Sequence, residues 1–343
     1  MPRLLPWRQS PKNDADFLRT EAREKSHALR KDSDPLWPLV PFRMEAHVES
    51  YDRMMFLLKL LARLPLPMLH GLGIVLGWLI YWAPGRHATR MRNNVFASGL
   101  CTPGHDCKNL LRQSIGESGK AIMELLPLWL SANKKVLMLV KDRSGWEHID
   151  NARAAGKGVI LVAPHIGCFE IIGQYFGSLH PFTIMYKPSP KPLLDALMLK
   201  GRQRSQTKLV PTDMSGVRAL LAALKRHEGI GILPDQVASS GDGVWADFLG
   251  RPAYTPTLVA SLQRKTGAAA FFVAAERLSW GRGFHLHVYP MDETLAQDKT
   301  AAALRINQGV EAVVRHFPAQ YLWNYNRHKC PGGVELPVAS PVA

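Results

Sequence analysis

The stretch Gly158-Val-Ile-Leu-Val-Ala-Pro-His-Ile-Gly-Cys-Phe-Glu170 decides the fold. Its apolar half predicts a buried β-strand that ends at Pro164, because proline cannot donate a hydrogen bond to a neighbouring strand. Gly167 then allows the chain to turn into a helix. His165 is therefore expected at the carboxyl end of a strand, where α/β sheets bind their ligands.

Short β-rich runs alternate with helical stretches from Lys157 onward. Strands are expected at 159–163, 182–186, 208–210, 230–233, 269–275 and 285–289, and helices at 169–177, 193–205, 217–226, 257–266 and 301–317. This alternation predicts a mixed α/β fold with a largely parallel central sheet flanked by helices. The chain has 343 residues and no internal repeat, so we expect one catalytic domain, at 85–335, with N-terminal additions.

The N-terminal additions differ in character. Residues 1–50 are polar and charged, lack a signal-peptide pattern, and are interpreted as a solvated tail or an over-extended translation start. Residues 51–84 are largely apolar and predict a membrane-anchoring helical segment. The sixteen uncharged residues at 68–83 fall short of the roughly 20 that span a bilayer. A spanning helix, a monotopic anchor and a buried core helix all remain open.

Charge and cysteine content restrict the function classes. Lys and Arg number 43 against 28 Asp and Glu, a net charge of +15 that attracts anionic lipid, an acidic carrier protein or nucleic acid. No nucleic-acid-binding signature is present, so we expect no nucleic-acid partner. The four cysteines show neither metal-binding nor disulfide spacing, which predicts a reducing compartment. Cys168 is interpreted as a buried apolar residue rather than a nucleophile.

His165 and Glu170 are the predicted catalytic pair. Glu170 falls in the first turn of the following helix, where it can hold one imidazole nitrogen and leave the other as a general base. Such a base removes the proton of an acceptor hydroxyl, which then attacks an acyl thioester directly. The alternative is a buried histidine at a strand end, with Glu170 as a favourable charge at a helix N-terminus.

Downstream motifs supply candidate substrate-binding residues. Arg202 and Arg204 follow an apolar helix and suit phosphate or a developing oxyanion, or are solvated. A second strand ends in Pro234-Asp-Gln236, so Asp235 and Gln236 are expected on the same rim as His165, to shape the site or bind the acceptor; a turn-capping Asp235 is the alternative.

Arg251 lies in a predicted tight turn and completes the substrate-binding set. Thr255 and Pro256 are expected to begin a helix, as its N-cap and first residue. We expect neither a cofactor nor a metal ion, because Asp235 has no second ligand at a suitable spacing.

Taken together, the motifs resemble the bacterial late lipid A acyltransferases of the lysophospholipid acyltransferase superfamily. The resemblance covers about 54–329 and rests on blocks in the same order: Leu69–Trp78, His165-x4-Glu170, Tyr186…Arg204, Pro234–Gln236, Phe248–Thr257 and Gln320–Arg327. It implies a glycerolipid acyltransferase-like fold and transfer of a fatty acyl chain from acyl carrier protein to a hydroxyl of a lipid A precursor. It also implies catalysis by His165 and Glu170, and a place on the cytoplasmic side of the bacterial inner membrane.

Two departures from the family pattern leave alternatives open. The leading tail is outside it, and Trp323-Asn-Tyr-Asn-Arg-His328 replaces the usual Trp-x-x-x-Arg-Phe ending. An acyltransferase acting on a glycerolipid or ornithine lipid, perhaps with acyl-CoA as donor, is the first alternative. A non-enzymatic binder of membranes or nucleic acid is the second, although it gives the His165 motif no role.

Overall fold

The computed structural model describes residues 53–101, 106–291 and 295–337, so the predicted tail at 1–50 lies outside it. A seven-stranded sheet forms the centre, in the order β1-β9-β8-β2-β5-β3-β4. Its strands are β1 (Val140–Ser144), β2 (Val159–Val162), β3 (Phe182–Tyr186), β4 (Thr207–Pro211), β5 (Gly229–Ile232), β8 (Ala269–Arg277) and β9 (Phe284–Pro290). All neighbouring strands are parallel except β8 and β9, which confirms the mixed, largely parallel α/β fold.

Helices cover both faces of this sheet. They are α7 (Trp146–Ala154), α8 (Phe169–Leu179), α9 (Pro192–Arg202), α10 (Met214–Lys225), α11 (Leu258–Thr266) and α12 (Lys299–His316). Successive residues of β5 face opposite sides of the sheet. A Cβ on Gly229 would meet Phe176 of α8. Ile230 instead packs in the core cluster with Leu220 of α10 and Val259 of α11. A buried sheet with helical layers on both sides follows from this alternation.

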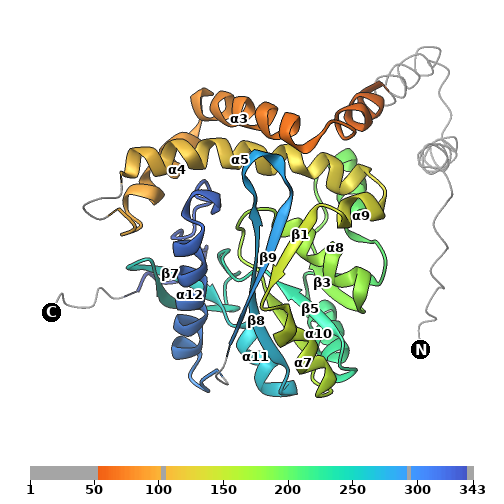
Figure 1. Ribbon diagram of the computed structural model, residues 1–343. Coiled ribbons are helices and arrows are strands. Elements are labelled where there is room, and N and C mark those ends of the chain that lie inside the picture. Colours follow the sequence, from red (N-terminus) through yellow and green to blue (C-terminus); the bar gives the residue numbers. More distant parts are fainter. Residues whose placement is uncertain (1–52, 102–105, 292–294, 338–343) are drawn as a thin grey trace, which may run out of the picture. The chain divides into compact units, whose positions relative to one another are not determined.

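Two further helices lie side by side across one end of the sheet (Figure 1). They are α3 (Leu66–Trp82) and α5 (Cys107–Leu130), with α4 (Arg86–Phe96) and α6 (Asn133–Leu137) beside them in the chain. Glycines allow α3 and α5 to approach closely, because a Cβ on Gly119 would lie 1.9 Å from the carbonyl oxygen of Gly73. Such contact between backbones is possible only where side chains are absent.

This close approach predicts a large difference between two glycine variants. Gly119→Ala is expected to lower the free energy of unfolding by about 1–3 kcal/mol, since an added methyl group overpacks the contact. Gly71→Ala on α3 is the matched control, because nothing lies within 4 Å of its Cβ position and alanine favours a helix over glycine. Denaturant unfolding of both variants measures the difference. Equal stability of the two would contradict the close packing of α3 on α5.

A buried ion-pair network fastens α5 to the sheet. Arg277, at the end of β8, donates to Glu124 through Nε and Nη2 (2.5 and 2.8 Å) and to Glu117 through Nη1 (2.6 Å). His70 of α3 bonds the same Glu124 at 2.6 Å. Burial alone would raise the pKa of Glu124, but the charge of Arg277 and the hydrogen bonds outweigh it and hold that pKa below its usual value. The network therefore joins α3, α5 and β8 through charged groups.

The structure differs from the sequence predictions of local structure in two places. β1 was not predicted, because its sequence, Val-Lys-Asp-Arg-Ser, is almost wholly exposed and lacks an apolar pattern. The segment expected to lead into a helix at Thr255 instead forms a hairpin of β6 (Gly243–Phe248) and β7 (Arg251–Pro256). Thr255 is the fifth residue of β7, fully buried, and α11 has Thr257 at its N-cap position.

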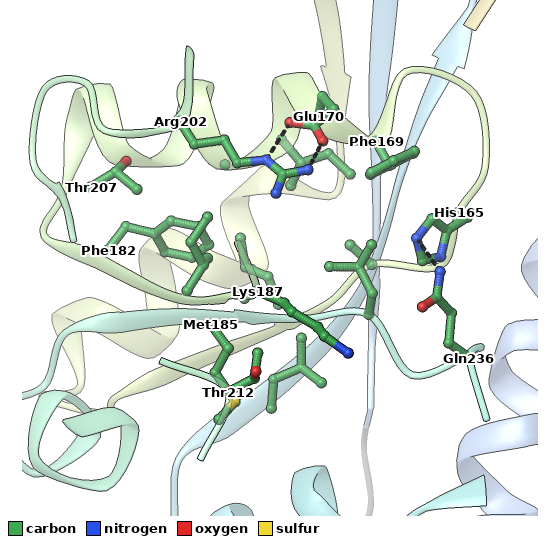
Figure 2. A pocket seen from close by; sticks show the side chains of 18 of the residues that line it. His165, Phe169, Glu170, Phe182, Met185, Lys187, Arg202, Thr207, Thr212 and Gln236 are labelled. Carbon is green, nitrogen blue, oxygen red and sulfur yellow. Dashed lines mark hydrogen bonds and ion pairs between the residues drawn. The ribbon is translucent and has the colours of Figure 1, made fainter. Parts of the chain in front are cut away.

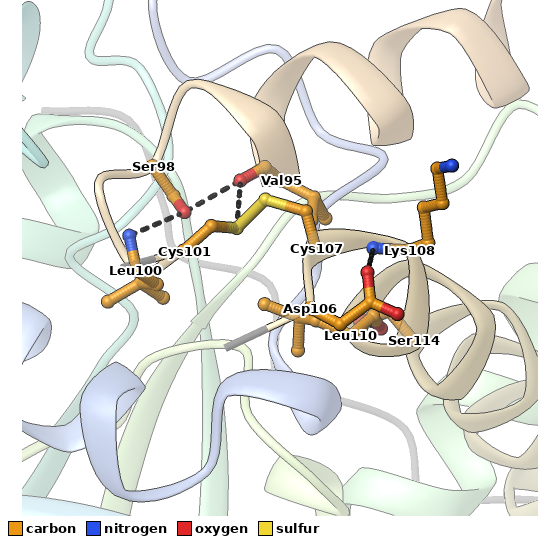
Figure 3. The surroundings of a disulfide bond; sticks show 9 residues. All are labelled: Val95, Ser98, Leu100, Cys101, Asp106, Cys107, Lys108, Leu110 and Ser114. Carbon is orange, nitrogen blue, oxygen red and sulfur yellow. Dashed lines mark hydrogen bonds between the residues drawn. A yellow bond between two sulfur atoms is a disulfide. The ribbon is translucent and has the colours of Figure 1, made fainter. Parts of the chain in front are cut away.

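The prediction that no cysteines pair was also wrong. Cys101 and Cys107 form a disulfide, drawn with its neighbours in Figure 3. Their six-residue separation was too short to suggest a disulfide framework in a chain with only four cysteines. Cys168 is free and buried, and Cys330 is free and exposed.

α3 is apolar on all sides but buried on only one. Leu69, Gly73 and Gly77 are buried. The opposite side exposes a line of apolar side chains at 40–70% of their surface: Met68, Leu72, Ile74, Val75, Leu79 and Trp82. By length and composition no single described helix is a candidate to span a bilayer; Arg53–Leu61 and Leu66–Trp82 are such a candidate only as a pair, bent by 115°.

Candidate active site

The prediction that two strands ending in proline and a polar residue meet on one rim is confirmed. β2 and β5 are adjacent and parallel, with Val162 opposite Ile232. His165 follows β2 and Asp235 follows β5, so the two side chains emerge from neighbouring strand ends. The turn after His165 is held on β8, where the Cys168 N–H donates to the Ala275 carbonyl at 2.9 Å.

Asp235 holds the His165 imidazole. The Asp235 carboxylate bonds the ring Nδ1 at 2.8 Å through one oxygen and accepts the backbone N–H of His165 at 2.9 Å through the other. The side chain of Asp235 is 2% exposed, and that of His165 is 11% exposed. A carboxylate on Nδ1 places the proton there and leaves Nε2 with a free electron pair, so Nε2 is the candidate base.

The charge state of Asp235 fits this role. Burial alone would raise its pKa, but the positive charge that His165 carries when protonated and the hydrogen bonds from His165 outweigh burial and lower the pKa below its usual value. Asp235 is therefore ionised at neutral pH. The opposite effect operates on Tyr321, whose pKa is raised well above its usual value by burial and by the nearby charge of Asp235.

Glu170 does not contact the imidazole as the sequence predicted. Its carboxylate accepts two hydrogen bonds from the Arg202 guanidinium, from Nε at 3.0 Å and from Nη2. Burial alone would lower the pKa of Arg202, but the bonds and charge of Glu170 raise it, so Arg202 keeps its charge. Glu170 is thus paired with Arg202, and Asp235 is the carboxylate that bonds the His165 imidazole.

His165, Glu170 and Arg202 line one cavity of about 470 Å³, whereas Asp235 holds the imidazole from outside its lining. Figure 2 shows the Glu170–Arg202 pair and the His165–Gln236 contact on different sides of this space. Part of its lining is apolar and comes from α8 and the sheet, with contributions from Leu161, Ile172, Phe182, Ile184 and Gly231. A largely apolar cavity with polar groups near a strand end suits an acyl chain with its reactive carbon near His165.

Gln236 and Lys187 are two further polar residues of the cavity lining, which also includes Gln174, Thr207 and Thr212. The Gln236 amide lies 3.1 Å from Nε2 of His165 and donates to it, since Nδ1 carries the proton. Lys187 lines the same cavity, on the side opposite the Glu170–Arg202 pair in Figure 2, and within the described residues its ammonium group makes no hydrogen bond or ion pair. Lys187 was not predicted as a site residue. Its position directly after β3 was the available signal, since His165 also lies just beyond a strand end.

Arg204 and Arg251 do not line this cavity. Arg204 donates to the Trp129 carbonyl and, at 2.9 Å, to the Ser131 carbonyl at the end of α5. Arg251 begins β7 and lies 3.5 Å from the side-chain oxygen of Asn94. Arg204 thus satisfies helix-end carbonyls, and the prediction that these two arginines bind substrate has no contact with the cavity to support it.

Cys168 has the properties of a filler residue. Burial, its largest influence, raises its pKa well above the usual value for a thiol. A thiol that stays protonated is a poor nucleophile. The geometry therefore supports a histidine base acting on a substrate hydroxyl rather than a covalent cysteine intermediate.

Comparison with known proteins identifies the family. A sequence model described as bacterial lipid A biosynthesis acyltransferase matches residues 47–330. The chain belongs to this family. Members are O-acyltransferases, so the protein is an enzyme that transfers acyl groups to oxygen. The family match includes both strand ends that carry His165 and Asp235.

Individual relatives agree with this assignment. The chain is 28% identical over 281 residues to the lipid A biosynthesis lauroyltransferase of Escherichia coli K12, covering 80% of this chain and 90% of that protein. It is 26% identical over 271 residues to the palmitoleoyltransferase of the same strain, covering 78% and 87%. A phosphatidylinositol mannoside acyltransferase of Mycobacterium tuberculosis is 28% identical over 195 residues, covering 55% and 61%.

Proposed function

We propose that this acyltransferase moves a fatty acyl chain from an acyl carrier protein thioester to a hydroxyl of a lipid A precursor. The observation that carries the proposal is the His165 imidazole, held by Asp235, on the wall of a largely apolar cavity in a chain of this family. A lipid A precursor supplies the hydroxyl groups and phosphates that such a site needs. The net charge of +15 favours both an acidic carrier protein and an anionic acceptor.

In the proposed mechanism, His165 Nε2 accepts the proton of the acceptor hydroxyl. Asp235 keeps the other nitrogen protonated and stabilises the imidazolium that forms. The hydroxyl oxygen attacks the thioester carbonyl, and the carbonyl oxygen becomes negatively charged. When this intermediate collapses, the carbon–sulfur bond breaks and the imidazolium returns its proton to the departing thiolate. The acceptor hydroxyl must first take over the hydrogen bond that Gln236 makes to Nε2.

The cationic groups of the cavity have separate roles in this proposal. Glu170 orients Arg202 through two hydrogen bonds, which fixes the guanidinium at the cavity wall. Lys187 has no partner within the part of the chain that the structure describes, and it can approach a phosphate or the developing oxyanion. Glu170 thus acts by positioning Arg202, a role that differs from the one its spacing to His165 predicted.

We also propose that the enzyme binds the cytoplasmic leaflet of the bacterial inner membrane along α3, as a monotopic protein. The exposed apolar line from Met68 to Trp82 suits insertion into the interface, since an apolar helix with one free side gains energy by leaving water. Arg86 and Arg90, in the next helix, suit lipid phosphates. A helix already packed on α5 along its other side lies on the enzyme surface, which favours a monotopic anchor over a spanning one.

The reaction is tested by incubating the purified protein with acyl carrier protein thioester and a lipid A precursor, with products followed by mass spectrometry. The expected result is one added acyl chain, in ester linkage. Parallel reactions replace the donor with acyl-CoA, or the acceptor with a glycerolipid or ornithine lipid. The likeness to a phosphatidylinositol mannoside acyltransferase gives the glycerolipid alternative a specific basis. Faster transfer to a glycerolipid than to the lipid A precursor would overturn the proposed acceptor.

The close packing around Gly231 in the cavity wall predicts that this position limits the length of the acyl chain that binds. A Cβ there would lie 2.7 Å from Phe182 and 2.9 Å from Ile184, both of which line the cavity. Gly231→Val is expected to lower activity with the longest accepted donor by about tenfold or more relative to a shorter one. Phe182→Ala is expected to shift the preference toward longer chains.

Competition among acyl donors of increasing length measures these preferences. Gly332→Val is the control, because nothing lies within 4 Å of that Cβ position. An unchanged length profile in both the Gly231 and Phe182 variants would show that the chain binds elsewhere.

A further inference from the structure

Two histidines and a glutamate gather on the sheet away from the residues of the acyl-transfer cavity. His285 and His287 are alternate residues of β9, so their side chains share one face of the sheet. Glu276 of β8 is directly opposite His285 in the antiparallel pair and lies on that same face. The backbone register therefore brings an imidazole pair and a carboxylate together.

The donor atoms of this cluster converge. One ligand atom from each of the three residues lies within 4.8 Å of the other two. The two rings are stacked with centroids 4.0 Å apart, and His287 Nε2 lies 2.8 Å from the Glu276 carboxylate. Bonds to zinc of about 2.0–2.2 Å in a tetrahedral arrangement separate ligand atoms by roughly 3.4 Å, so small side-chain rotations bring the three donors onto one ion.

We propose that Glu276, His285 and His287 form a binding site for a divalent transition-metal ion, with zinc as the ion of choice. Two imidazoles and one carboxylate are ligands that suit zinc, and three protein ligands leave a fourth position for water. All three residues are partly exposed, so the ion can enter from solvent. Ser144 of β1 bonds His285 Nε2 at 2.7 Å and can orient that ring.

An ion at this position would connect β8 to β9. Glu276 lies between Ala275, which accepts a hydrogen bond from the turn after His165, and Arg277, which holds α5. An ion bound to both β8 and β9 joins the ends of two strands on which these contacts depend. Metal binding is therefore expected to stabilise the fold, because an ion that binds only the folded state shifts the unfolding equilibrium. This inference does not depend on the proposed acyl acceptor or donor.

The test uses the full-length, untagged chain stripped of metal. Zn²⁺ is titrated in competition with a chromophoric chelator, and Co²⁺ is titrated with visible spectra recorded. We expect one tight Zn²⁺ per chain, a Co²⁺ spectrum typical of four-coordinate nitrogen and oxygen ligation, and a higher melting temperature with Zn²⁺. His285→Ala/His287→Ala should weaken Zn²⁺ binding by at least about 100-fold, since even outer partners of a metal site contribute about 10–100-fold.

Two controls separate this site from general binding to surface histidines. His87→Ala/His148→Ala removes two exposed histidines elsewhere and should leave Zn²⁺ affinity unchanged. Glu276→Gln keeps the shape of the cluster and tests it where the double variant fails to fold; it should lose at least about tenfold in affinity. The proposal is overturned by a wild-type chain without tight Zn²⁺ binding, or by full affinity in the His285→Ala/His287→Ala or Glu276→Gln variant.

Discussion

His165→Ala is expected to lower the rate of acyl transfer by about 10²–10⁴, the usual contribution of a general base. The structure gives the reason: His165 Nε2 faces the apolar cavity, while Asp235 holds Nδ1. No other imidazole lines this cavity among the residues that the structure describes. Turnover at saturating donor and acceptor measures the loss.

The control for this variant is His148→Ala, which removes an exposed histidine outside the cavity. The melting temperature of His165→Ala is expected to fall, because buried Asp235 loses its partner, so turnover is compared at a temperature at which both proteins are folded. A variant that folds and retains near-normal turnover would eliminate His165 as the base.

Asp235→Asn is expected to cause a loss of similar size, about 10²–10⁴ in turnover. The substitution keeps the shape of the side chain but removes the charge that stabilises the imidazolium and allows the wrong ring nitrogen to carry the proton. Asp235 is buried and makes two hydrogen bonds to His165, so no other described carboxylate takes over its role.

Glu170→Gln is the matched comparison, because it removes one charge from a carboxylate on the same cavity. The structure predicts a different result for it. Loss of the ion pair disturbs Arg202, so the Michaelis constant for the phosphorylated acceptor should rise more than turnover falls. The interpretation from sequence, in which Glu170 orients His165, predicts the reverse order. Turnover that falls further in Glu170→Gln than in Asp235→Asn would restore that interpretation.

The sheet and the place of the site were predictable from a few residues. Pro164 and Pro234 each end an apolar run and are followed by His165 and Asp235. Because adjacent parallel strands end at the same edge, the two polar residues had to be near one another if β2 and β5 were neighbours. The helical layers on the two faces of the sheet were predictable as well, because each buried strand is a distinct apolar run and a helical stretch follows most of them.

The partner of the imidazole was not predictable in the same way. Glu170 is five residues from His165 and Asp235 is seventy residues away, so proximity in sequence favoured the wrong carboxylate. The direction of the Glu170 side chain depends on its ion pair with Arg202, the last residue of α9. The position of Arg202 therefore depends on how α9 packs, which the sequence around Glu170 does not show. Likewise, the role of Arg204 depends on the carbonyls at the end of α5, which lie about as far away in sequence as Asp235 does from His165.

The exposed and irregular segments were also beyond the reach of sequence patterns. β1 is a polar edge strand that exists because β9 supplies its hydrogen bonds. The β6–β7 hairpin contains Pro252 and Pro256, residues that a strand prediction normally rejects. In both cases tertiary pairing overrides local preference, which a single sequence does not display.

The hydrogen bond from Gln236 to His165 Nε2 has a consequence for the order of events in the proposed reaction. While the amide occupies that electron pair, the base is unable to activate a water molecule. A loaded but waiting enzyme is thereby protected from hydrolysing its own thioester, which would waste the activated fatty acid. Only a ligand that displaces the amide, such as the correctly seated lipid alcohol, sets the base free.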